Sequence, residues 1–273
     1  MKKAIWIFIV IFTCVSTIIL NAKVFDCFIF FNELDILQIR LEEMYDQVDY
    51  FVLVESSETF RGNFKPAYYH NNQHLFSKWA DKIIYVYVPE TYDSIDAWDR
   101  EFYQRNQILR GLNKASDDDI ILISDVDEIV RSSDMPRLID SVKNDPKHIT
   151  GCIQTLYSYY INRRQLGKEM YWHGTKAVSF NLLKTSNPQK IRVSHPTYII
   201  ENSGWHFSSI GHENFLQKVK AYSHVENDNQ AFMTNLKAFI NELELVNIDE
   251  SFPKYILDNI SYFEEIKFID TNH

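Results

Sequence analysis

The sequence has few cysteines, and they form no pattern that could crosslink a fold or hold zinc. Cys14, Cys27 and Cys152 are the three in 273 residues, and Cys14 lies within an apolar N-terminal run. The other two make no disulfide framework, and no Cys-x-x-Cys or Cys/His spacing typical of a zinc site is present. Cys27 and Cys152 are therefore predicted to be small buried hydrophobic side chains.

The sequence also contains few glycines and prolines, and it has no excess of basic charge. With 7 Gly and 7 Pro the chain has little room for flexible linkers, and it contains no internal repeat. The formal net charge of −9 would repel a phosphate backbone, so nucleic acid is not an expected partner. A hydrophobic content of 45% and an aromatic content of 15% argue against disorder. The length fits one large domain.

An apolar run follows Lys2 and Lys3 at the N-terminus and covers residues 4–20 without a charge. As a helix it would rise about 25 Å, which is at the lower limit for crossing a hydrocarbon core. A cleavable signal peptide has the same pattern. We expect an uncleaved single-pass type II membrane anchor, with the domain that follows it facing the Golgi or ER lumen if the protein is eukaryotic. Residues 1–22 are assigned to this anchor or signal segment, and 23–273 to one folded domain.

Short β-branched or aromatic runs alternate with segments of helical periodicity in the first half of the domain. Strands are predicted at 24–31, 50–55, 82–88 and 119–124, and helices at 33–46, 71–79 and 97–112. This alternation predicts an α/β fold with a mostly parallel sheet flanked by helices, whose site opens at the carboxyl ends of the strands. The second half is less regular. Strands are predicted near 177–183 and 197–200, and helices at 213–225 and 229–245.

Three acidic residues come directly after the fourth predicted strand, in the segment Ser124-Asp125-Val126-Asp127-Glu128. Carboxylates beside a buried strand are unfavourable unless a cation or donor compensates them. Asp125 and Asp127 could together bind a hard divalent ion such as Mn²⁺ or Mg²⁺. An EF-hand loop is excluded, because Val130 stands where such a loop needs glycine. An aspartyl-phosphate phosphohydrolase with Asp125 as nucleophile, and a solvated acidic turn, remain as alternatives.

Several further motifs, in this order and spacing, resemble glycosyltransferase family 17. The matching pieces are Phe31–Leu37, Val48–Ser56, Thr59–Gly62 with Lys65-Pro66, Asp96-Ala97-Trp98, Arg105, Asp125–Ile129, Gly204–Ser208 and Lys218. The resemblance implies a GT-A type nucleotide-diphospho-sugar transferase fold. It also implies a metal-dependent inverting transfer of N-acetylglucosamine from UDP-GlcNAc to a mannose-containing glycan or glycoprotein, with β-1,4 linkage.

The same resemblance implies roles for individual residues. Asp127 would bind Mn²⁺ or Mg²⁺ directly, Asp125 would hold the ribose or the water shell of the ion, and His206 would complete the metal site. The remaining candidates fall into three groups: Glu55, Ser56, Arg61, Trp98 and Arg105 for the donor, Trp172 and Trp205 for the acceptor, and Glu128 or Glu213 as the catalytic base. A phosphohydrolase and a catalytically inactive sugar-binding protein are the alternative functions.

Overall fold

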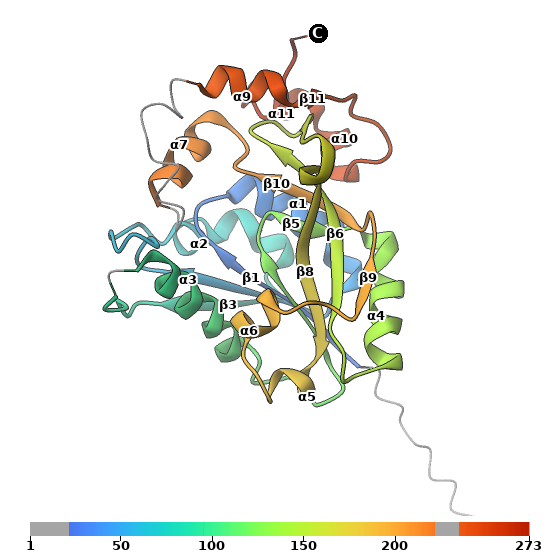
Figure 1. The fold of residues 1–273 in the computed structure, drawn as a ribbon. Helices are drawn as coiled ribbons and strands as arrows, with labels where there is room; N and C mark the ends of the chain where they lie inside the picture. Colours follow the sequence, from blue (N-terminus) through green and yellow to red (C-terminus); the bar gives the residue numbers. More distant parts are fainter. Residues whose placement is uncertain (1–21, 95, 222–234, 273) are drawn as a thin grey trace, which may run out of the picture.

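An eleven-stranded mixed sheet forms the framework of the protein (Figure 1). The computed structural model describes residues 22–94, 96–221 and 235–272. The predicted anchor at residues 4–20 lies outside this part of the chain. Within the described ranges, no helix is long and apolar enough to cross a membrane.

The strands run in the order β11-β7-β6-β8-β4-β1-β2-β3; in addition, β9 and β10 pair with β6, and β5 pairs with β10. Their bounds are β1 Val24–Phe30, β2 Tyr50–Ser56, β3 Ile83–Val88, β4 Ile120–Asp125, β5 Glu128–Val130, β6 Thr150–Ser158, β7 Arg163–Arg164, β8 Tyr171–Ser179, β9 Tyr198–Ile200, β10 Gly204–Ser208 and β11 Glu244–Leu245. Strands β3, β2, β1 and β4 are mutually parallel, whereas β8 runs antiparallel to both β4 and β6. The predicted α/β fold is confirmed, with a parallel first half and a mixed second half.

Helices cover both faces of this sheet (Figure 1). The α-helices are α1 Leu34–Met44, α2 Tyr68–Asn71, α3 Ala97–Asn106, α4 Met135–Asn144, α5 Phe180–Leu183, α6 Pro188–Val193, α7 His212–Ala221, α9 Leu236–Glu242, α10 Lys254–Asp258 and α11 Ile260–Glu265. Short 3₁₀ helices are η1 Tyr45–Gln47, η2 Gln73–Trp79, η3 Gln107–Gly111, η4 Ser132–Asp134 and η5 Gly167–Met170.

The alternation of side chains along β1 divides the core between the two faces. Phe28 and Phe30 pack with the apolar residues of α1, α4, α10 and α11. Cys27 and Ile29 pack on the other face with residues of η3, α5 and α6. Successive strand residues point to opposite faces, so a strand buried on both sides must be apolar throughout. This explains why β1 is recognisable in the sequence as a continuous apolar run, and why Cys27 is buried as predicted.

Several predicted elements differ from the structure. The helix expected at 71–79 is the end of α2 followed by the 3₁₀ helix η2. The strand expected at 177–183 is the end of β8 followed by α5, because the side chain of Ser179 caps a helical turn by accepting a hydrogen bond from the backbone N–H of Leu182. The helix expected at 97–112 changes from α3 to the 3₁₀ helix η3 after Asn106. The helices expected at 213–225 and 229–245 appear in part as α7 and α9. Residues 222–234 lie outside the described residues, and the end of the second predicted helix is instead strand β11.

Gly204 begins β10 at the point where β10 pairs with β5. Its φ is +143°, and a Cβ atom there would lie 2.1 Å from the carbonyl oxygen of Ile129. We expect Gly204→Ala to lower the free energy of unfolding by about 3 kcal/mol or more, because the two backbones must separate. Gly167 is a matched control, since its φ is also positive (+64°) but nothing lies within 4 Å of an added Cβ.

Urea denaturation of Gly204→Ala and Gly167→Ala measures this difference. The Gly167 variant should lose only about 1 kcal/mol, the cost of a left-handed backbone for alanine. Equal losses in the two variants would contradict the close approach of β5 and β10.

Candidate active site

A cavity of about 740 Å³ opens beside the carboxyl ends of β1 and β4. Its wall contains the residues that follow β1, the loop after β4, the end of β10, and side chains from α3, α6 and α7. Five carboxylates line it, from Glu33, Glu58, Glu101, Asp125 and Asp127. Parallel strands deliver their carboxyl ends to one edge of a sheet, which is where the sequence predicted the site.

Arg40 of α1 holds the acidic loop in place from beneath. Its guanidinium is fully buried and donates hydrogen bonds to the backbone carbonyls of Asp125, Val126 and Glu128, at 3.0, 3.2 and 2.8 Å. A second interaction ties it to Asp26 of β1, with Nε 2.7 Å from Oδ2. A buried guanidinium requires such partners, and its planar fork can satisfy several of them at once. The loop conformation therefore depends on a helix almost ninety positions earlier in the chain.

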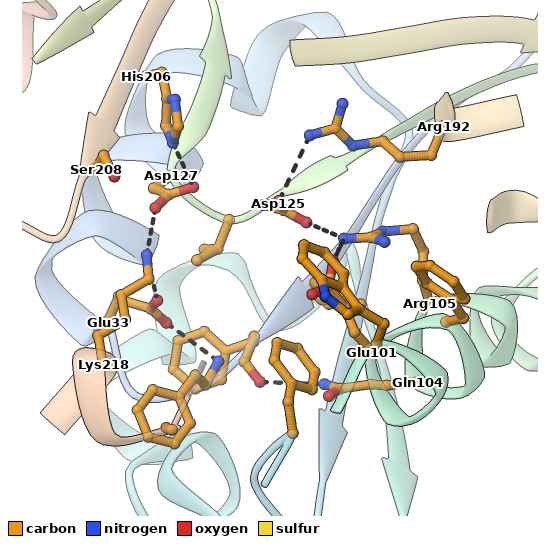
Figure 2. A pocket seen from close by; sticks show the side chains of 18 of the residues that line it. Glu33, Glu101, Gln104, Arg105, Asp125, Asp127, Arg192, His206, Ser208 and Lys218 are labelled. Atoms are coloured by element: carbon orange, nitrogen blue, oxygen red, sulfur yellow. Dashed lines mark hydrogen bonds and ion pairs between the residues drawn. The ribbon is translucent and has the colours of Figure 1, made fainter. Parts of the chain in front are cut away.

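The pairing of β5 with β10 brings His206 to Asp127. Glu128 and His206 are register partners, and the backbone N–H of Phe207 donates to the carbonyl of Asp127 at 2.9 Å. The His206 Nε2 atom lies 3.4 Å from Asp127 Oδ1 (Figure 2). Both side chains line the cavity. These two predicted metal-site residues therefore meet, although they are far apart in the sequence.

Lys218 of α7 contacts the other oxygen of Asp127. Its Nζ lies 2.6 Å from Asp127 Oδ2 and 3.2 Å from Glu33 Oε1. Figure 2 shows Lys218 between these two carboxylates. Burial raises the pKa of the Asp127 carboxyl, but Lys218 and His206 outweigh this effect and hold the pKa below its usual value. Burial lowers the pKa of the Lys218 ammonium, but the charges of Asp127 and Glu33 raise it by more than burial lowers it, so the net pKa is raised. Both groups stay charged at neutral pH.

Asp125 lies between two arginines on the opposite side of the loop. Its Oδ1 is 2.8 Å from Arg105 Nη2, and its Oδ2 is 3.6 Å from Arg192 Nη2 (Figure 2). Burial raises its pKa, but the two guanidiniums lower it more, and the net pKa is below the usual value. Asp125 and Asp127 thus share one cavity but have different partners.

Glu128 does not line the cavity, and its carboxylate is fully buried. It accepts hydrogen bonds from the indole N–H of Trp172, the guanidinium of Arg192 and the backbone N–H of Asp125. A carboxylate with both oxygens occupied and no access to solvent is poorly placed to take a proton from a substrate. Its contacts instead hold Trp172, whose ring centroid lies 4.7 Å from that of His206 at the cavity wall.

The predicted donor residues are divided between the cavity and the interior. Trp98, Arg105 and Asp125 line the cavity, whereas Glu55, Ser56 and Arg61 do not. The Glu55 carboxylate is fully buried and accepts from the backbone N–H of Tyr69 and from the hydroxyl of Tyr85. It therefore stabilises the chain around β2 and β3 and does not face the cavity.

Two more predicted residues lie outside the cavity. Trp205 neighbours His206 on β10 and must point to the opposite face, where it packs in the core beside Phe207 at 3% exposure. Its indole N–H donates to the carbonyl of Ser251, so its ring is not available to an acceptor. Glu213 is exposed in the first turn of α7 and does not line the cavity. Trp172 does line it and is 37% exposed.

Besides Glu58 and Lys65, three charged residues that line the cavity and contact the two aspartates or their partners were given no role by the sequence. They are Glu33, Arg192 and Lys218. Glu33 and Lys218 belong to motifs that resemble the family, and Lys218 lies within a predicted helix, where a lysine usually faces solvent. Arg192 lies on the short helix α6, which the sequence analysis did not predict.

Asp127 and His206 fit a divalent ion as a pair of ligands. Two ligand atoms that bind the same Mg²⁺ or Mn²⁺ ion, each at about 2.1 Å, lie roughly 3 Å apart when the two bonds are at right angles. The observed 3.4 Å between Asp127 Oδ1 and His206 Nε2 is close to this value. Among the described residues, no three His, Cys, Asp or Glu side chains form a metal-binding group. Phosphate oxygens and water would complete the shell, as is usual for Mg²⁺.

Three solved structures show a limited likeness to the chain. A mannosyltransferase, PcManGT from Pyrobaculum calidifontis in complex with GDP-Man and Mn²⁺, is 13% identical over 66% of this chain and 56% of its own, with a TM-score of 0.42. TarS 1–349 from S. aureus is 12% identical over 71% and 62%, with a TM-score of 0.40. GalNAc-T7 with UDP, GalNAc and Mn²⁺ is 11% identical over 91% and 57%, with a TM-score of 0.42.

No curated protein matches the sequence significantly, but a protein-family model does. The family model described as glycosyltransferase family 17 matches residues 14–243, which include the acidic loop, β10 and the Lys218 helix. The chain therefore belongs to glycosyltransferase family 17, and its α/β fold is of the GT-A type that the sequence predicted.

Proposed function

We propose that this glycosyltransferase transfers N-acetylglucosamine from UDP-GlcNAc to a mannose-containing glycan or glycoprotein, with inversion and with β-1,4 linkage. The observation that carries the proposal is the meeting of Asp127 and His206 at a cavity that also contains Lys218, Arg105 and Arg192. Such a cavity offers carboxylate and imidazole to a metal and positive charge to a diphosphate.

Each side of the acidic loop has its own role in this proposal. Asp127 and His206 would hold Mn²⁺ or Mg²⁺, which when bound would neutralise the charge of the departing diphosphate. Asp125, oriented by Arg105, would accept a hydrogen bond from a ribose hydroxyl. Trp98 and Trp172 provide aromatic walls on which a base or a sugar ring can stack.

Inverting transfer also needs a carboxylate that takes the proton of the attacking acceptor hydroxyl. The placement of Glu128 and Glu213 outside the cavity disfavours both predicted candidates. Of the five carboxylates that line the cavity, Asp125 and Asp127 have other proposed roles and both oxygens of Glu33 are occupied, which leaves Glu58 and Glu101 as candidates for the base. The hydroxyl would attack the anomeric carbon from the side opposite the diphosphate, so the α-linked donor sugar would become a β-linked product.

Glu128→Gln separates a positioning role from a catalytic one. We expect the free energy of unfolding to fall by about 2 kcal/mol, since the substitution removes the buried charge that pairs with the partly buried Arg192. We expect kcat to fall less than about tenfold. If Glu128 were the base, kcat would fall by about a hundredfold or more without a loss of stability.

The proposed function is tested with radiolabelled UDP-GlcNAc, UDP-GalNAc and GDP-mannose, each with Mn²⁺ or with EDTA, and with and without mannose-terminated glycans. We expect UDP-GlcNAc to be hydrolysed slowly without acceptor and transferred with it, in both cases only with metal. Preference for another donor would contradict the assigned sugar. Release of phosphate from simple esters without any nucleotide-sugar turnover would favour the phosphohydrolase, and donor binding without turnover would favour the inactive sugar-binding protein.

We further propose that residues 4–20 anchor the protein as a single-pass type II membrane protein. The support is the uncharged apolar run after Lys2 and Lys3. Alkaline carbonate extraction of the full chain tests it. The protein should remain with the membrane pellet, and a shortened chain in the soluble fraction would indicate a cleaved signal peptide.

A further inference from the structure

The Lys218 ammonium forms an ion pair with one of the two carboxylate oxygens through which Asp127 could bind a metal. Its side chain is 6% exposed, and the side chains of Asp127 and Glu33 are 3% and 7% exposed. All three line the cavity, but they come from α7, from the loop after β4 and from the segment before α1. This buried cluster contains two negative charges and one positive charge.

Glu33 is fixed in an orientation that serves Lys218. Its Oε2 accepts hydrogen bonds from the backbone N–H groups of Phe31 and Asn32, at 3.1 and 3.0 Å. This leaves Oε1 directed at the lysine, 3.2 Å away. Buried carboxylates are strongly unfavourable without a compensating cation, so the ammonium is needed whenever no other cation is present.

A divalent ion at Asp127 and His206 would lie beside this ammonium. Two cations a few ångströms apart repel each other strongly in a buried site, even with an effective dielectric constant of about 20. A bound diphosphate changes this balance, because its oxygens provide negative charge for both cations at once. Lys218 could then keep Glu33 and exchange Asp127 for a phosphate oxygen.

We propose that Lys218 is the resident counter-ion of Asp127, and that it makes tight binding of a divalent ion depend on a nucleoside diphosphate in the same cavity. This inference rests on the proposed function for the identity of the metal and of the diphosphate. It adds an order of binding: the metal arrives with the donor or after it, and leaves with the diphosphate product. Lys218 is a positioning and neutralising residue in this scheme.

Titration of the full protein with Mn²⁺ by calorimetry, with and without UDP, tests the proposal. The wild type should bind Mn²⁺ weakly alone and much more tightly with UDP. Lys218→Met should bind Mn²⁺ alone about tenfold or more tighter than the wild type, because the vacated space borders an oxygen from both Asp127 and Glu33. The gain in Mn²⁺ affinity caused by UDP should be smaller in this variant than in the wild type.

Lys65→Met is the matched control. Lys65 lines the same cavity and is also buried, but its ion-pair partner is Glu55, at 3.5 Å. Its removal should leave the Mn²⁺ affinity of the donor-free protein unchanged within about twofold. Lys218→Arg keeps the positive charge and should remain close to the wild type.

Equal Mn²⁺ affinity of the wild type and Lys218→Met without UDP would overturn the proposal, and so would an absence of Mn²⁺ binding by both proteins with UDP present. If Lys218→Met does not fold, the wild type alone decides, since micromolar binding of Mn²⁺ without UDP contradicts a resident counter-ion. The proposed function fails separately. A protein with the expected binding order but no sugar transfer would keep this inference and lose the function, whereas transfer without the order would do the reverse.

Discussion

Asp127→Asn is expected to lower donor hydrolysis and sugar transfer by roughly 100- to 1,000-fold, with the loss mainly in kcat. The amide keeps the size of the side chain but removes the negative charge that His206 and Lys218 contact. A neutral oxygen is a weak ligand for Mn²⁺ or Mg²⁺, so the diphosphate would leave without its main electrostatic stabilisation. Initial rates with UDP-GlcNAc and Mn²⁺ measure the effect.

The control for this prediction is Asp140→Asn, the same substitution on the exposed face of α4. It should retain full activity. Circular dichroism should show that both variants are folded, since Lys218 keeps Glu33 as a partner when Asp127 is neutral. Wild-type activity in folded Asp127→Asn would remove this carboxylate from the catalytic site.

Arg40→Met is expected to cause the largest loss of stability, about 3–5 kcal/mol. The substitution leaves the fully buried Asp26 carboxylate without its cation and removes hydrogen bonds to three carbonyls of the acidic loop. Such a loss is a large part of the total stability of a typical domain. Urea denaturation measures it, and the activity of the protein that remains folded should also fall because the loop is no longer held.

Two further variants separate the buried charge from the shape of the side chain. In Arg40→Met combined with Asp26→Leu, no unpaired charge remains, and we expect at least half of the lost stability to return. Arg137→Met, at an exposed position of α4, should change stability by less than about 0.5 kcal/mol. If Arg40→Met were as stable as Arg137→Met, the buried pair could not be what holds the acidic loop.

The central strands were predictable because burial on both faces requires them to be apolar throughout. The predicted ranges 24–31 and 119–124 match β1 and β4 within one residue at each end. The acidic loop was predictable for the same reason, since charged residues that directly follow such a strand must lie at its carboxyl edge. The second half was harder to predict, because β6 and β8 mix polar and aromatic residues and face different surroundings along their lengths.

The direction of individual side chains could not be predicted from motif membership. Trp205 and His206 belong to one motif, yet neighbouring strand residues face opposite sides, so one packs in the core and the other lines the cavity. Glu55 lies at the end of β2, as predicted, but its carboxylate is used by Tyr69 and Tyr85.

The partners of the two aspartates depend on packing between segments far apart in the chain. Arg192 and Lys218 reach Asp125 and Asp127 from α6 and α7, about 67 and 91 positions later. No local pattern marks a lysine that turns inward from a helix that begins with the exposed residues His212 and Glu213. The positions of Asp125, Asp127, His206 and Arg105 at the cavity were predictable from the family resemblance, whereas the charged residues that contact the two aspartates from α6 and α7 required the structure.

A crystal structure of the protein with UDP and Mn²⁺ tests the central claim most directly. The account predicts one Mn²⁺ ion about 2.0–2.3 Å from an Asp127 carboxylate oxygen and from His206 Nε2, with the diphosphate oxygens on the same ion inside the cavity. A UDP molecule bound outside this cavity, or an ion that contacts neither Asp127 nor His206, would contradict it.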